Sequence, residues 1–215
     1  IQNGVDLSEV DAYRKLDASI EPRSANGKRI GFVGQMIPRK AVEELLLTFD
    51  DLWQEDPSLT LNLLGDGSER QSLEDLAQTL ESASNIHFLG FRLDRLDQMR
   101  TFDLFAMTST LEGIPRCLME AMAMELPVAA YNIPGVDQLI EHEKTGLLAS
   151  PGDRKALKSH WKKLLTDDEY ARDIATAGRK FVNEKYSGAR MANEYTELFS
   201  CLVNGQLPYT YQSGA

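Results

Sequence analysis

The chain has 215 residues, and 42% of them are hydrophobic, which is enough to bury a sizeable core in one large domain or two small ones. Its formal net charge of -10 argues against nucleic-acid binding, which needs a basic face, but leaves room for a local anion site. The two cysteines, Cys117 and Cys201, provide neither a disulfide framework nor a zinc site and fit a reducing cytosol. No run of about 18 apolar residues is present, so the sequence predicts no membrane span.

The N-terminal segment, residues 1–28, is mostly polar and has few apolar positions at regular spacing. We therefore expect a linker followed by a short irregular lead-in. The chain starts without Met, and the turn-forming pair Asn3-Gly4 follows almost at once. This beginning is typical of a cut made within a longer chain.

From residue 29 onward, short runs with strand character alternate with longer amphipathic runs. Strands are predicted at 29–34, 59–65, 85–90, 103–109, 127–132 and 146–150. Helices are predicted at 41–54, 68–82, 94–101, 117–125, 136–143, 153–165, 168–185 and 188–203. Ser68 and Gln71 have capping-box spacing at the start of the second helix.

The alternation of helices with continuous apolar strands indicates an α/β fold. It predicts a Rossmann-like, doubly wound parallel sheet of about six strands, covered on both faces. The predicted domain spans 29–203, and residues 204–215 form a tail whose Gly, Pro and Ser content indicates loose order.

Ligands of such sheets bind at the loops that follow the carboxyl ends of the strands. The first of these loops carries Arg39 and Lys40 beside a helix N-terminus, which favours a phosphate; a solvated basic pair is the other interpretation. In the second loop, Gly65 and Gly67 permit either a tight turn or close approach of a ligand. Neither G-x-G-x-x-G after the first strand nor a P-loop motif occurs, which disfavours a redox dinucleotide enzyme and a P-loop nucleotidase.

Two carboxylates, Glu112 and Glu120, flank the start of the helix that follows the fourth strand. They could accept hydrogen bonds from sugar hydroxyls, act as an acid/base pair, or be one helix-end charge and one solvated charge. A metal site is disfavoured because no third ligand is close and the histidines, at 87, 142 and 160, are scattered.

Taken together and in order, the loop motifs resemble the C-terminal, donor-binding domain of retaining GT-B glycosyltransferases, in the large family 4 (glycosyl transferases group 1). The matching segments are NGVD at 3–6, GFVGQMIPRKAVEELLLTF at 31–49, LNLLGDGSER at 61–70, NIHFLGF at 85–91, EGIPRCLMEAMAMELPVAAYNIPGV at 112–136 and EKTGLLASPGD at 143–153. The resemblance extends from residue 3 to about residue 200, so the expected fold is one half of a GT-B protein.

The resemblance also implies roles for individual residues. Glu112 would face the donor sugar and Glu120 the ribose hydroxyls, with Lys40 on the diphosphate and Phe91 in the loop of the base pocket. Glu112 and Lys40 are thereby the expected catalytic residues. The backbone that would lie against the diphosphate belongs to Gly113, Ile114, Pro115 and Arg116.

Two departures from the family pattern affect this site. Gln35 stands where the family usually has an arginine, so leaving-group stabilisation would come from Lys40 with Arg39 or Arg116. Pro115 stands where many members have glycine, so one backbone N–H is absent.

The implied activity is transfer of a hexose from a UDP- or GDP-type sugar nucleotide, with retention of configuration and without a metal cofactor. The family's N-terminal acceptor-binding domain has no counterpart here, so we expect this domain to bind donor but to be inactive alone. The last helix, 188–203, would pack on that missing domain. The parent would act in the cytoplasm, or at the cytoplasmic face of a membrane, on a lipid-linked or polysaccharide acceptor.

Two alternative functions remain at this stage. One is a GT-B sugar-nucleotide epimerase fragment, for which no catalytic carboxylates and histidine can be assigned. The other is a non-catalytic nucleotide-sugar binding module, which Gln35 favours.

Overall fold

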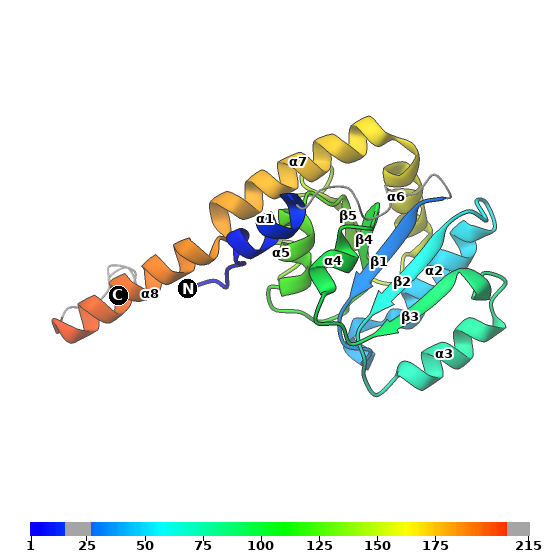
Figure 1. Cartoon of the computed structure of the whole chain (residues 1–215), viewed down its shortest axis with the longest axis horizontal. Coiled ribbons are helices and arrows are strands. Elements are labelled where there is room, and N and C mark those ends of the chain that lie inside the picture. The colour runs from blue at the N-terminus through cyan, green and yellow to red at the C-terminus, as the bar shows by residue number, and fades with distance from the viewer. Residues whose placement is uncertain (16–26, 206–215) are drawn as a thin grey trace.

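A computed structural model describes residues 1–15 and 27–205 of the chain. Six strands form one parallel sheet in the order β3-β2-β1-β4-β5-β6 (Figure 1). Their bounds are β1 Arg29–Val33, β2 Thr60–Leu64, β3 Ile86–Gly90, β4 Leu104–Met107, β5 Val128–Tyr131 and β6 Leu147–Ala149. The predicted α/β, Rossmann-like sheet is thus confirmed, and each predicted strand is present with slightly shorter bounds.

Eight α-helices and two 3-10 turns accompany these strands in the described part of the chain. The α-helices are α1 Leu7–Lys15, α2 Val42–Trp53, α3 Arg70–Thr79, α4 Arg95–Met99, α5 Arg116–Ala123, α6 Arg154–Thr166, α7 Asp168–Lys185 and α8 Gly188–Val203. The 3-10 turns are η1 Pro38–Lys40 and η2 Ala83–Asn85. The predicted bounds of α7 and α8 agree with the structure, and those of α2 to α6 agree to within three residues at either end.

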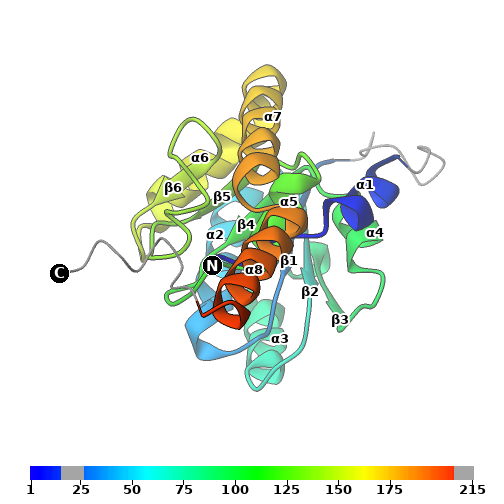
Figure 2. The ribbon, with the colours of Figure 1, turned by 90° about the vertical axis from the view of Figure 1, so that its left-hand side faces the viewer.

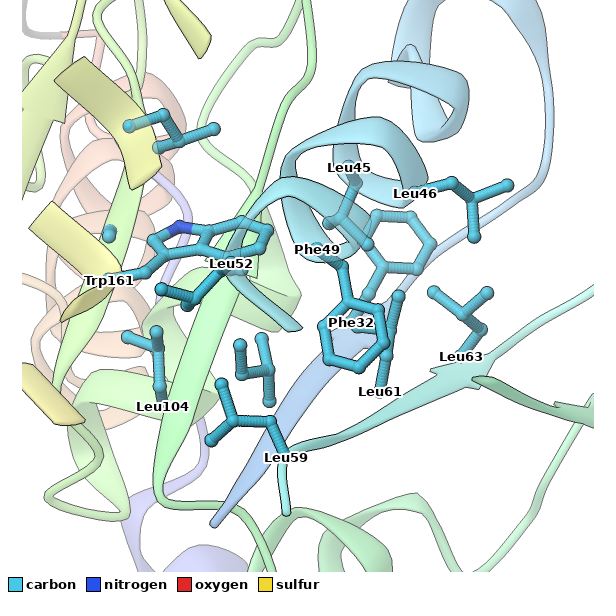
Figure 3. Close-up of a cluster of buried hydrophobic side chains, with 14 of the residues drawn as sticks. Phe32, Leu45, Leu46, Phe49, Leu52, Leu59, Leu61, Leu63, Leu104 and Trp161 are labelled. Carbon is cyan, nitrogen blue, oxygen red and sulfur yellow. The ribbon is translucent and has the colours of Figure 1, made fainter. Parts of the chain in front are cut away.

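The two faces of the sheet carry separate apolar clusters because successive strand side chains point to opposite sides. In β4, Leu104 and Ala106 pack on one face, while Phe105 and Met107 pack on the other. The first cluster joins the sheet to α2, α3 and α6, and Figure 3 shows Trp161 of α6 beside Leu52 of α2. The second cluster joins the sheet to α1, α4 and α5.

The predicted irregular lead-in is wrong for its first part, because residues 7–15 form α1. Asp6 caps this helix by accepting hydrogen bonds from the backbone N–H groups of Ser8 (2.9 Å) and Glu9 (3.2 Å). Val5 and Val10 are buried, and α1 packs against α4 and α5. Residues 7–15 contain too few apolar positions to show a helical repeat in the sequence. Tertiary packing supplies most of the stability of such a helix. Residues 16–26 of the predicted lead-in and 206–215 of the predicted tail lie outside the described residues.

Two local predictions are corrected by the structure. The helix expected at 136–143 is a series of turns in which Val136 and Leu139 are nevertheless buried, so three- and four-residue spacing of apolar side chains arose without a helix. The capping box expected from Ser68 is absent, because α3 begins at Arg70 after Glu69, which makes no side-chain cap. The backbone N–H of Glu69 instead donates to the carbonyl of Met36 (2.9 Å), which holds this turn against the loop after β1.

The C-terminal helix α8 extends away from the sheet in Figure 1, and it lies in front of the other elements in Figure 2, which views the molecule from that side. None of its residues is buried, and Phe199 and Leu202 are both more than half exposed. The idea that it packs on another domain stays a prediction. Cys117 and Cys201 are free thiols. Within residues 1–15 and 27–205, no helix combines the length and apolarity needed to cross a membrane.

Candidate functional site

The candidate site lies where the strand order reverses. The chain runs from β1 outward to β3, and β4 then returns to the other side of β1. In sheets of this kind a crevice forms outside the carboxyl ends of the two strands at the reversal, here β1 and β4. The loops that carry Lys40 and Glu112 follow these two strands.

Backbone hydrogen bonds tie the loops of this edge to one another. The carbonyl of Arg39 accepts from the N–H of Thr110 (2.8 Å), which joins the loops after β1 and β4. The hydroxyl of Thr108 donates to the carbonyl of Ala41 (2.9 Å), and Ala41 itself is held in the left-handed region with φ 45°. A non-glycine residue in this region is strained and needs surrounding structure to hold it.

Two glycines let these loops approach more closely than other residues would allow. Gly65 has φ +141°, and a Cβ there would lie 1.8 Å from the carbonyl oxygen of Gly34. Gly135 has φ +92°, and a Cβ there would lie 1.5 Å from the carbonyl oxygen of Gly113. The sequence left two interpretations of Gly65, a tight turn or close approach of a ligand; in the structure it is the backbone of Gly34 that lies against Gly65. Gly135, which the sequence prediction did not single out, supports the loop expected to meet a diphosphate.

Glu112 is held by two cations from the first loop. The ammonium of Lys40 donates to Oε1 of Glu112, and the side chains of this pair are only 8% and 7% exposed. Nη1 of Arg39 lies 3.3 Å from Oε2 of Glu112 and 3.2 Å from the carbonyl oxygen of Leu111. The interpretation of Lys40 and Arg39 as a freely solvated pair is therefore wrong, since Lys40 is buried and both side chains bond the loop after β4.

Glu120 lies in a second cationic cluster and is 2% exposed. Nε and Nη2 of Arg95 donate to its Oε2 (3.1 Å) and Oε1 (2.7 Å), and Nε of Arg116 also donates to Oε1 (2.8 Å). Because α5 begins at Arg116 after the N-cap residue Pro115, Glu120 lies in the second turn and not in the first. Two guanidinium groups, more than the helix dipole, compensate the burial of this carboxylate.

Arg95 is a charged site residue that the sequence prediction missed. It is the first residue of α4, directly after the loop that follows β3, and this position on the ligand edge was the available signal. Its partner lies 25 residues further along the chain.

The N-terminus of α5 is open to a ligand. Pro115 precedes the helix in an extended conformation, and no side chain among the described residues caps this end. A Cβ on Gly113 would meet no atom within 4 Å, and Gly113 is exposed. Unpaired N–H groups and the helix dipole at such an end attract an anion.

Burial raises the pKa of the neighbouring Cys117 thiol to about 11, an effect that Lys40 opposes and that Glu112 and Glu120 reinforce. The thiol is therefore protonated at neutral pH and is a poor nucleophile. In the described part of the chain, no three His, Cys, Asp or Glu side chains are grouped so as to hold a metal ion.

A groove of about 430 Å³ opens beside the second cluster. It is lined by the ends of β1 and β2 and by the loop after β3, and it includes the predicted site residues Gln35 and Phe91. Phe91 is 76% exposed, so its ring is available to a planar ligand. Arg95 is also part of this wall, which links the groove to Glu120.

The predicted residues thus gather at one edge in three connected parts. The parts are a buried carboxylate–ammonium pair, an open helix N-terminus, and a groove with an exposed aromatic ring beside a second buried carboxylate. Such a site suits a ligand that combines a planar group, hydroxyl groups and phosphates.

Comparison with known proteins agrees with this chemistry. Residues 14–181 match the protein family described as glycosyl transferases group 1. An uncharacterized glycosyltransferase of Haemophilus influenzae is 27% identical over 169 residues, which are 78% of this chain and 48% of that protein. The capsular polysaccharide biosynthesis glycosyltransferase CapM of Staphylococcus aureus is 24% identical over 175 residues, 81% of this chain and 46% of CapM.

Among solved structures, the Anabaena protein HepE in complex with UDP superposes with a TM-score of 0.82 at 26% identity. The match covers 93% of this chain and 56% of HepE, so the chain spans about half the length of the proteins that it resembles. The family match includes every strand of the sheet and both carboxylate clusters. The chain therefore belongs to the glycosyl transferases group 1 family and has the fold of the C-terminal domain of a GT-B glycosyltransferase.

Proposed function

We propose that this chain is the donor-binding half of a retaining glycosyltransferase. It binds a nucleoside diphosphate sugar of the UDP type, and an acceptor domain outside this sequence completes the enzyme. UDP is the first choice because the related HepE was crystallised with it. A polysaccharide or its lipid-linked precursor is the proposed acceptor, in line with the similarity to CapM.

The observation that carries this proposal is the buried Lys40–Glu112 pair at the reversal of strand order. Transfer of the sugar leaves negative charge on the departing diphosphate, and preorganised cations and N–H groups stabilise that charge. Lys40 supplies a cation and the N-terminus of α5 supplies N–H groups, both at this edge of the sheet. Glu112 can then accept hydrogen bonds from the sugar hydroxyls, because a carboxylate has about four acceptor positions.

Arg39 is the proposed second cation for the leaving group. The neutral amide of Gln35 cannot supply charge, and Arg116 pairs with Glu120, the carboxylate assigned to the ribose. Arg39, in contrast, reaches Glu112 with one nitrogen and keeps a side chain that is 41% exposed. Since two side-chain cations and a helix end face the diphosphate, the proposed mechanism uses no metal ion.

The first test is calorimetric titration of the chain with UDP, GDP and ADP, each with and without its common sugar. We expect UDP to bind selectively, and Glu120→Ala to weaken binding by about 1–3 kcal/mol through loss of charged hydrogen bonds. Glu74→Ala is the matched control, because Glu74 pairs with Arg70 on α3 and lies outside the two clusters. Absence of nucleotide binding at millimolar concentration, or equal binding by Glu120→Ala, would refute the donor-site assignment.

A further inference from the structure

The buried carboxylate of Glu120 has few acceptor positions left for a ligand. Oε1 accepts hydrogen bonds from both Arg95 and Arg116, and Oε2 accepts a third from Arg95. A carboxylate offers about four lone-pair positions, two on each oxygen. One position therefore remains, and it is on Oε2, so Glu120 can accept a hydrogen bond from only one of two neighbouring hydroxyl groups while both arginines stay in place.

Arg95 stands between Glu120 and the groove. Glu120 is 2% exposed and does not line the groove, whereas Arg95 lines it and keeps 27% of its side chain exposed. Of the five N–H donors of a guanidinium, Glu120 uses one on Nε and one on Nη2. Among the described residues, Nη1 of Arg95 has no hydrogen-bond partner, so this end of the guanidinium has donors to spare.

Arg116 differs from Arg95 although both hold Glu120. Its side chain is 65% exposed and does not line the groove. Both arginines also lie near Glu9 of α1, whose carboxylate oxygens are 3.9 Å from Nη2 of Arg95 and 3.8 Å from Nη2 of Arg116. Of these two arginines, Arg95 is therefore the one that joins the buried carboxylate to the groove.

We propose that Arg95 is a specificity-determining residue of the nucleotide site, an inference that rests on the donor function proposed above. Its fork holds Glu120 so that the free position of Oε2 accepts a hydrogen bond from one ribose hydroxyl. Its remaining N–H groups donate to the oxygen of the neighbouring ribose hydroxyl. The ribose diol is thus recognised by a carboxylate and a guanidinium together, each taking one hydroxyl.

The test compares the affinities of UDP, 2′-deoxy-UDP and 3′-deoxy-UDP for wild-type protein and for Arg95→Lys. In wild type, each missing hydroxyl should weaken binding by about tenfold or more, the loss expected for a hydrogen bond to a charged group. Arg95→Lys keeps the charge but cannot donate two parallel hydrogen bonds to the two oxygens of Glu120, as the guanidinium does. It should lose the penalty for one of the two deoxynucleotides, whereas a purely structural role would weaken all three nucleotides equally.

Two further variants complete this test. Arg116→Lys should weaken all three nucleotides by a similar factor and keep both deoxynucleotide penalties. Arg100→Lys, at the end of the same helix beside Asp97, should bind like wild type. If Arg95→Lys keeps both penalties, or if wild type binds the deoxynucleotides as tightly as UDP, the inference is overturned. Failure of wild type to bind any of the three would instead refute the donor function itself.

Discussion

Replacing Lys40 with methionine tests whether the Lys40–Glu112 pair is as desolvated as the structure shows. The substitution leaves the Glu112 carboxylate buried, with a side chain 7% exposed and without its ammonium partner. Removing one member of a buried pair costs about 3–5 kcal/mol. Because Arg39 remains 3.3 Å from Glu112 and is itself half-exposed, it still compensates part of the charge, and we expect a smaller loss of about 2–3 kcal/mol.

The assay is equilibrium unfolding in urea at pH 7, followed by circular dichroism. For a chain of this length the expected loss corresponds to a fall in Tm of roughly 4–12 °C. The double variant Lys40→Met/Glu112→Gln removes both charges and should recover most of the stability, which gives a coupling energy of about 2 kcal/mol. This recovery would separate a desolvated pair from a general effect of losing the lysine side chain.

A matched cycle on Arg70 and Glu74 supplies the control, because these side chains are 32% and 29% exposed on the surface of α3. An exposed helical pair of this kind should couple by only about 0.3–0.5 kcal/mol. If the Lys40–Glu112 cycle couples no more strongly than the Arg70–Glu74 cycle, the pair is solvated and our account of the site is wrong.

Three further predictions follow from particular contacts. Gly135→Ala should destabilise the fold by at least about 1 kcal/mol and weaken UDP binding, because the added Cβ would displace the Gly113 carbonyl. The control is Gly152→Ala, which should affect stability alone, because Gly152 also has a positive φ (+80°) but no atom lies near its Cβ. Equal losses of UDP affinity in the two variants, measured by calorimetry, would contradict this prediction. Burial lowers the pKa of His160 below its ordinary 6.5, so the unfolded chain takes up a proton that the folded chain resists, and the free energy of unfolding should fall as the pH drops below about 6.5. His160→Gln should flatten this fall between pH 7.5 and 5.5 in urea titrations, and an unchanged slope would disprove the assignment. Cys117 is partly buried and its pKa is raised to about 11, so iodoacetamide should alkylate it at pH 8 far more slowly than a free thiol. Rapid labelling of Cys117, detected by peptide mass spectrometry, would refute the raised pKa.

Much of the site was predictable because its residues sit on loops whose place follows from the strand pattern. Continuous apolar runs separated by helical periods allow few arrangements other than a parallel sheet, and a parallel sheet brings its strand-to-helix loops to one edge. Lys40, Phe91, Glu112 and Glu120 could therefore be assigned to one edge from the sequence. A helix was wrongly predicted at 136–143 because turns can also bury apolar residues at helical spacing.

The sequence by itself determined the layers of this protein and the edge on which its charged loops meet, because hydrophobic periodicity is a local property of the chain. Only the tertiary structure decided which charges pair. The order β3-β2-β1-β4 places Lys40 against Glu112, and the packing of α4 on the sheet places Arg95 against Glu120. These pairs join residues that are 25 and 72 positions apart in the sequence. Hydrophobic periodicity does not indicate which residues so far apart in the chain meet in space. They depend on the strand order and on loop backbones that approach each other at Gly65 and Gly135, where any side chain would collide.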